Sequence, residues 1–174
     1  MAKINLSDLD VIRNLRDKQL LVELDENMRR KDGIILTICS DGDHSDDWLT
    51  HQRKFNKRIH LYAHHGGALI LSTSELENPR RILLLKDMRD GVKMKVIRTI
   101  ALGIHYPCQW ARDRGLGIHQ QLLMLREACL VTRGLFVNYG HKEFPPGKEI
   151  LEIVPLLHVF YGNKRREYRV VIDY

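Results

Sequence analysis

Short apolar runs alternate with amphipathic segments along the 174-residue chain. Residues 34–38 are all Ile, Leu or Thr, a pattern typical of a strand buried on both faces of a parallel sheet. Residues 59–62 and 96–104 predict two further strands. Residues 154–161 and 167–172 alternate between apolar and polar side chains and predict two more strands joined by a turn.

Helical patterns occupy the segments between these strands. Residues 1–31 predict an N-terminal helical arm, with loosely spaced apolar positions on one face. Residues 46–57 begin with acidic side chains and end with basic ones, as the helix dipole favours. Residues 79–91 open on a proline and close on a glycine. Residues 118–132 predict a further helix, which we expect to end at Gly134.

The alternation of strands and helices indicates an α/β fold, with a mostly parallel β-sheet flanked by helices. No segment resembles a domain linker, so residues 1–174 are interpreted as a single α/β domain whose N-terminal arm covers about residues 1–31. A chain of this length can bury a sizeable core of its own.

Charge and cysteine content narrow the function classes. The formal net charge is +6, but the basic residues are scattered and no aromatic stacking pattern accompanies them. Binding to nucleic acid is therefore less favoured than a solvated basic surface. No apolar run reaches the roughly 18 residues of a membrane-spanning helix. Three cysteines without disulfide spacing suit a reducing compartment, and we expect a cytoplasmic protein.

Candidate chemistry gathers where predicted strands end. Polar clusters follow three strands, at residues 39–44, 64–67 and 105–108. The carboxyl ends of strands in an open α/β sheet border one crevice, so these clusters can meet in space. Cys39, His105 and Cys108 would then form a Cys₂His set, which suits zinc and leaves a fourth tetrahedral position.

Each candidate also has a purely structural interpretation. Cys39 can be a core thiol, and Cys129, on the apolar face of a predicted helix, is interpreted as one. Asp41 and Asp43 flank a glycine and can simply form a turn. Asp43 and His44 are also candidates for a polar pair that transfers protons.

Two motifs together resemble a known family. Cys39-Ser40-Asp41, followed by His105-Tyr106-Pro107-Cys108, is similar to the C-x-D-S-R and H-x-x-C-G patterns of the β-class carbonic anhydrases. Gly91-Val92-Lys93 resembles the turn that precedes the metal-bearing strand of that family. The resemblance implies a β-carbonic-anhydrase-like fold, a homodimer, and Zn²⁺ held by Cys39, His105 and Cys108. It also implies that Asp41 orients the zinc-bound water or binds the metal itself, and that carbon dioxide is hydrated to bicarbonate.

The chain departs from the family pattern near the metal. The family has an arginine two residues after the aspartate, and this arginine draws the aspartate away from zinc; here the residue is Asp43. A carboxylate cannot form that ion pair, so we expect Asp41 to ligate the metal. Asp41, Asp43 and His44 are accordingly the candidate catalytic residues.

These observations predict a zinc-binding, β-carbonic-anhydrase-like protein with a rebuilt active site. Its substrate would be carbon dioxide, bicarbonate or a related small electrophile. A catalytically inactive, zinc-stabilised binding or regulatory protein is one alternative, and a basic nucleic-acid binder is another. A vacant fourth position on zinc would distinguish the enzyme from the inactive protein.

Overall fold

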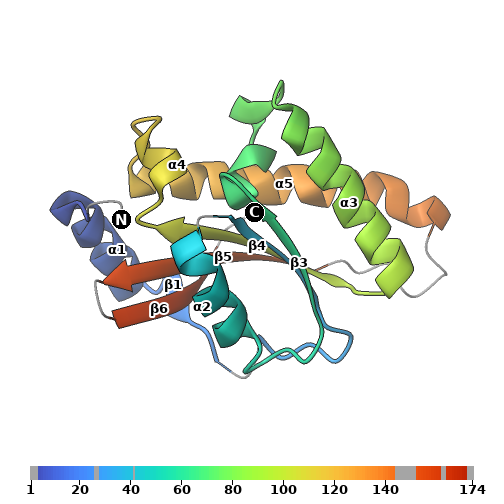
Figure 1. The fold of residues 1–174 in the computed structure, drawn as a ribbon, viewed down its shortest axis with the longest axis horizontal. Coiled ribbons are helices and arrows are strands. Elements are labelled where there is room, and N and C mark those ends of the chain that lie inside the picture. The colour runs from blue at the N-terminus through green and yellow to red at the C-terminus, as the bar shows by residue number, and fades with distance from the viewer. Residues whose placement is uncertain (1–3, 26–27, 41, 144–151, 162–163, 172–174) are drawn as a thin grey trace.

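The computed structural model describes residues 4–25, 28–40, 42–143, 152–161 and 164–171. One six-stranded sheet has the strand order β1-β6-β5-β4-β2-β3 (Figure 1). The strands are β1 (Leu21–Glu23), β2 (Ile34–Cys39), β3 (Ile59–His64), β4 (Thr99–Tyr106), β5 (Glu152–Tyr161) and β6 (Lys164–Val170). The β3, β2, β4 and β5 strands run parallel, whereas β6 and β1 add antiparallel pairs at one edge. The prediction of a mostly parallel α/β sheet is confirmed.

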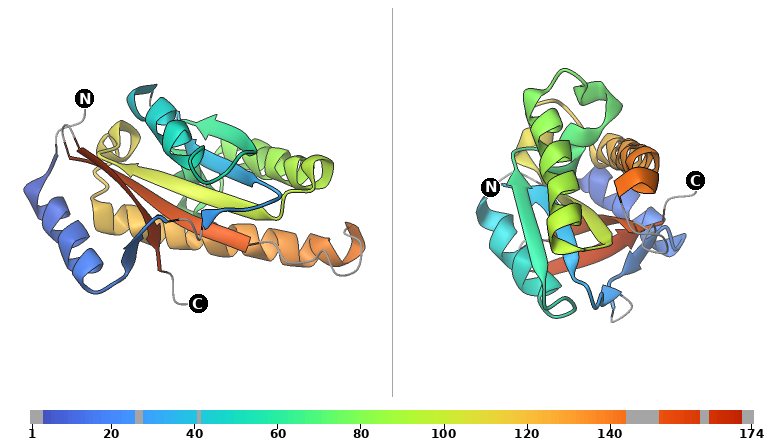
Figure 2. Two further views of the ribbon diagram at one scale, coloured as in Figure 1. Left: turned by 90° about the horizontal axis from the view of Figure 1, so that it is seen from below. Right: turned by 90° about the vertical axis from the view of Figure 1, so that its right-hand side faces the viewer.

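Helices cover both faces of this sheet (Figure 2). They are α1 (Leu6–Asp17), α2 (Gly42–Gln52), α3 (Pro79–Lys95), α4 (Gln109–Arg112) and α5 (Ile118–Glu143). Two short 3₁₀ turns, η2 (Gly67–Leu71) and η3 (Thr73–Glu75), lie between β3 and α3. Within the described ranges, no helix is both long enough and apolar enough to cross a lipid bilayer.

The β2 strand lies between two apolar cores, and all six of its residues are buried. Ile35 packs on one face, in the core that includes Leu84 of α3 and Leu125 of α5. Ile34 and its neighbours at alternate positions pack on the other face, against Trp48 of α2. Alternate residues of a strand point to opposite faces, so a strand with both faces covered needs an unbroken apolar run.

Two helix predictions were wrong near the N-terminus. Residues 21–23 form a strand and not part of a helical arm, because they pair with β6 at the edge of the sheet. The second helix was predicted over 46–57 but spans Gly42–Gln52. It therefore begins three residues after β2, so the polar segment after Cys39 is mostly the first turn of a helix.

Glycines also misled the prediction of helix ends. Gly91 lies inside α3, where a Cβ atom would be 2.8 Å from the Tyr62 hydroxyl and would push it from its hydrogen bond to the Asp87 carbonyl. The helix ends instead at Lys95, with Val96 as its C-cap at a φ of 56°, and β4 consequently starts at Thr99 and not at residue 96. Gly134 lies within α5, which continues to Glu143.

Gly134→Ala is expected to stabilise the protein by about 0.5–1 kcal/mol, because glycine in a helix interior costs that much relative to alanine. Gly134 is exposed, and a Cβ atom there would meet nothing within 4 Å. Chemical denaturation measures the change. Gly91→Ala serves as the matched control and should destabilise, because its Cβ would clash with Tyr62. A lower denaturation midpoint for Gly134→Ala would contradict this account.

Candidate metal site

Two neighbouring parallel strands deliver the candidate metal ligands. Cys39 is the last residue of β2, and His105 is the next-to-last residue of β4. Cys108 follows β4 by two residues and occupies the N-cap position of α4. Because β2 and β4 pair in parallel, their carboxyl ends meet at one edge of the sheet. The Sγ atoms of the cysteines and a ring nitrogen of His105 all lie within 4.8 Å of one another.

All three side chains are withdrawn from solvent, with exposed fractions of 2% for Cys39, 1% for His105 and 4% for Cys108. A hydrogen bond from the Cys108 thiol lowers the pKa of Cys39, and the neighbouring His105 lowers it further. The hydrogen bond to Cys39, together with burial, raises the pKa of Cys108. The site thus stabilises one thiolate, which is the form of cysteine that ligates metals.

A glycine pair at the start of η2, after β3, supports Cys39. Gly66 has a φ of 93°, and its backbone N–H donates a hydrogen bond to the Cys39 Sγ over 3.3 Å. Gly67 lies so near that a Cβ atom would be 2.5 Å from the Cys39 backbone nitrogen. The sequence predicts a polar cluster here, but its pattern does not predict this role of the two glycines. The Gly-Gly pair directly after a strand was the signal available.

The three residues fit a borderline-soft metal ion. Two sulfurs and one imidazole nitrogen are typical zinc donors, and three protein ligands leave a fourth position for water, substrate or another side chain. His105 and Cys108 approach from one turn, which contains a cis peptide bond between Tyr106 and Pro107. Within the described part of the chain, this is the group of His, Cys, Asp and Glu side chains that can hold a metal.

The remaining candidate residues follow β2 directly. Asp41 lies outside the described residues. Asp43 and His44 belong to the first turn of α2, but their side chains lie outside the described part of the structure. The catalytic assignment of all three residues, and the metal-ligand assignment of Asp41, therefore stay predictions.

Solved structures share this fold. The protein is similar to the β-carbonic anhydrase CafD of the filamentous fungus Aspergillus fumigatus, with a TM-score of 0.53 and 15% sequence identity over 87% of this chain and 99% of that one. A mutant of the same enzyme matches with a TM-score of 0.52 and 16% identity over the same shares of the two chains. Neither a protein-family model nor a curated protein sequence matches the chain. The fold is thus β-carbonic-anhydrase-like, as the motifs predicted.

Proposed function

We propose that the protein binds zinc through Cys39, His105 and Cys108 and acts on carbon dioxide, bicarbonate or a related small electrophile. The observation that carries this proposal is the meeting of three zinc-type donor atoms within 4.8 Å at the carboxyl ends of β2 and β4. It is supported by the similarity of the fold to a β-carbonic anhydrase. The homodimer implied by the family resemblance belongs to the same proposal.

The residues of the site would divide the work between holding the metal and controlling access to it. Zinc, when bound, supplies Lewis-acid chemistry. Burial of Cys39, His105 and Cys108 keeps competing water away from the donor atoms. The Gly66 N–H orients the Cys39 sulfur, as outer hydrogen bonds do for metal ligands in general. His44, at the start of α2, is our candidate proton acceptor.

Asp41 and Asp43 are expected to restrict this chemistry. A catalytic zinc site keeps an open position, whereas a site with four protein ligands is closed. With a carboxylate at position 43, no guanidinium is present there to hold Asp41 aside. We therefore propose that Asp41 occupies the fourth position, and that the site opens only when this carboxylate leaves the metal.

Hydration of carbon dioxide by zinc-loaded protein is accordingly expected to be slow, far below the ~10⁶ per second of the fastest zinc hydrases. Stopped-flow measurement with a pH indicator tests this directly. Asp43→Arg should raise turnover at least about tenfold, which corresponds to about 1.4 kcal/mol of barrier, by pairing with Asp41.

Asp46→Arg is the matched control, since it makes the same charge change further along α2 on an exposed residue. An equal gain in Asp46→Arg would mean that charge alone, and not the ion pair, sets the rate. Fast turnover in the unmodified protein would contradict the closed site. Zinc-loaded protein that stays inactive even with Asp43→Arg would favour the second candidate function, a zinc-stabilised binding or regulatory protein.

A further inference from the structure

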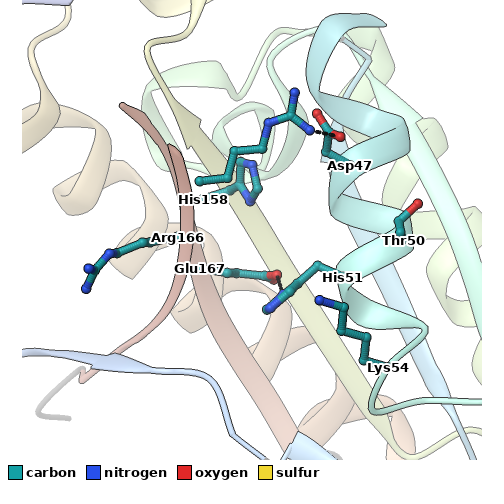
Figure 3. A pocket seen from close by; sticks show the side chains of 8 residues that line it. Asp47, Thr50, His51, Lys54, His158, Arg166 and Glu167 are labelled. Carbon is teal, nitrogen blue, oxygen red and sulfur yellow. Dashed lines mark hydrogen bonds and ion pairs between the residues drawn. The ribbon is translucent and has the colours of Figure 1, made fainter. Parts of the chain in front are cut away.

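A polar pocket lies between α2 and β6, and no residue of the candidate metal site lines it (Figure 3). Its volume is about 220 Å³. Its charged and titratable lining includes Asp47, His51, Lys54, Arg165 and Glu167. The family resemblance assigned nothing to these residues.

Glu167 contacts three side chains of α2 on one side of the pocket. Its side chain is only 1% exposed. The Trp48 Nε1–H and the Gln52 Nε2–H both donate to its Oε1 atom, each over 2.5 Å. Its Oε2 atom lies 2.5 Å from the His51 Nδ1 atom. A buried carboxylate surrounded in this way acts only as an acceptor, because an ionised carboxylate has no hydrogen to donate.

The hydrogen of His51 is consequently held on Nδ1, facing Glu167. In a neutral imidazole the other nitrogen then has no hydrogen and can only accept a hydrogen bond. This other nitrogen is Nε2, since Glu167 contacts Nδ1. The His51 side chain also lines the pocket. The neutral ring therefore presents an acceptor, and not a donor, to any ligand in the pocket.

Cationic groups supply the donors. Lys54 points into the same space as His51 (Figure 3). Arg165 lines the pocket and forms an ion pair with Asp47, and a guanidinium has further N–H groups to offer. Arg166 also lines the pocket, but its side chain binds Glu23 and points away from His51 in Figure 3. Asp47 and Glu167 offset the charges of Arg165 and Lys54 in this lining, but Lys54 forms no ion pair within the described residues, so its ammonium group is available to an anionic ligand.

We propose that this pocket binds a small oxyanion that carries a hydrogen, of the hydrogenphosphate type. Lys54 and Arg165 donate to its oxygens, and the Nε2 atom of His51 accepts the hydrogen of its P–OH group. Sulfate has nearly the same shape but carries no hydrogen near neutral pH. It would place an oxygen lone pair against the lone pair of Nε2, so the pocket should discriminate between the two anions.

Titration calorimetry at about pH 8 is the test. Inorganic phosphate should bind at least about tenfold more tightly than sulfate. A sulfate oxygen facing the Nε2 atom of His51 forms no hydrogen bond, whereas the P–OH group of phosphate donates one. Lys54→Met should weaken phosphate binding about tenfold. Lys86→Met is the matched control, because this exposed lysine on α3 does not line the pocket, and it should leave the affinity unchanged.

Glu167→Gln separates the hydrogen-bond assignment from a merely structural role. The amide can donate to Nδ1, which moves the imidazole hydrogen to Nε2 and turns an acceptor into a donor. Discrimination against sulfate should then disappear or reverse, a change that a loss of packing would not produce.

Several results would overturn the proposal. One is equal binding of phosphate and sulfate by the unmodified protein, and another is the absence of saturable phosphate binding. Phosphate binding insensitive to Lys54→Met would place the anion elsewhere, for example on the candidate metal. A phosphate monoester has lost its last hydrogen above about pH 6 and cannot donate to His51. If the ester bound as tightly as inorganic phosphate, the proposal would also be overturned.

Discussion

Cys108→Ser is expected to abolish stoichiometric zinc binding and to lower the free energy of unfolding by at least about 3 kcal/mol in zinc-containing buffer. The unmodified protein should carry about one zinc per chain, because Cys39, His105 and Cys108 already place their donor atoms together. A metal that binds the folded chain much more tightly than the unfolded chain adds its binding free energy to stability. Elemental analysis and denaturation with and without a chelator provide the measurements.

Cys129→Ala is the matched control for this experiment. Cys129 is fully buried, but it lies on α5 in the apolar core and outside the candidate metal group. Burial raises its pKa to about 12, so it stays a thiol. This variant should keep its zinc and remain sensitive to chelator. Unmodified protein that contains no zinc after growth with added zinc would refute the proposed metal site.

Trp48→Ala is expected to lower the free energy of unfolding by about 3–5 kcal/mol, as truncation of a large buried aromatic side chain does. Trp48 is fully buried in the core on the α2 face of the sheet. Its ring stacks on His158 with a centroid distance of 5.3 Å, and it lies so close to Gly103 that a Cβ atom there would be 2.4 Å away. Truncation leaves a cavity that this sheet face cannot fill by a small shift.

Trp48→Phe distinguishes the two contributions of the ring. Phenylalanine keeps most of the apolar volume but removes the N–H donor to Glu167. Loss of one donor to a buried carboxylate should cost about 1–3 kcal/mol, less than the full truncation. Urea denaturation of the three proteins gives both values. A loss below about 1 kcal/mol for Trp48→Ala, the size of an ordinary surface effect, would show that α2 is not packed as described.

The sequence by itself determined the class of fold and the composition of the candidate metal site. The unbroken apolar run at 34–38 predicted a strand buried on both faces, and β2 is such a strand. Parallel strands bring their carboxyl ends to one edge of the sheet. The prediction that Cys39 and His105 meet therefore depended on their positions near strand ends, and not on the number of residues between them. The apolar runs predicted the approximate ends of these strands, although β3 and β4 each continue two residues beyond the predicted ends.

Glycines and long-range polar pairs were decided only by the tertiary structure. A glycine after a helical pattern predicts the end of the helix, yet Gly91 lies inside α3, where a Cβ atom would come within 2.8 Å of the Tyr62 hydroxyl. The Gly66 backbone N–H donates a hydrogen bond to the Cys39 sulfur, and a pattern of side chains cannot predict such a backbone contact. His51 and Glu167 are 116 residues apart, and they meet because β6 pairs with β5 beneath α2. Such contacts depend on strand order and helix placement, and these follow from the packing of the whole chain.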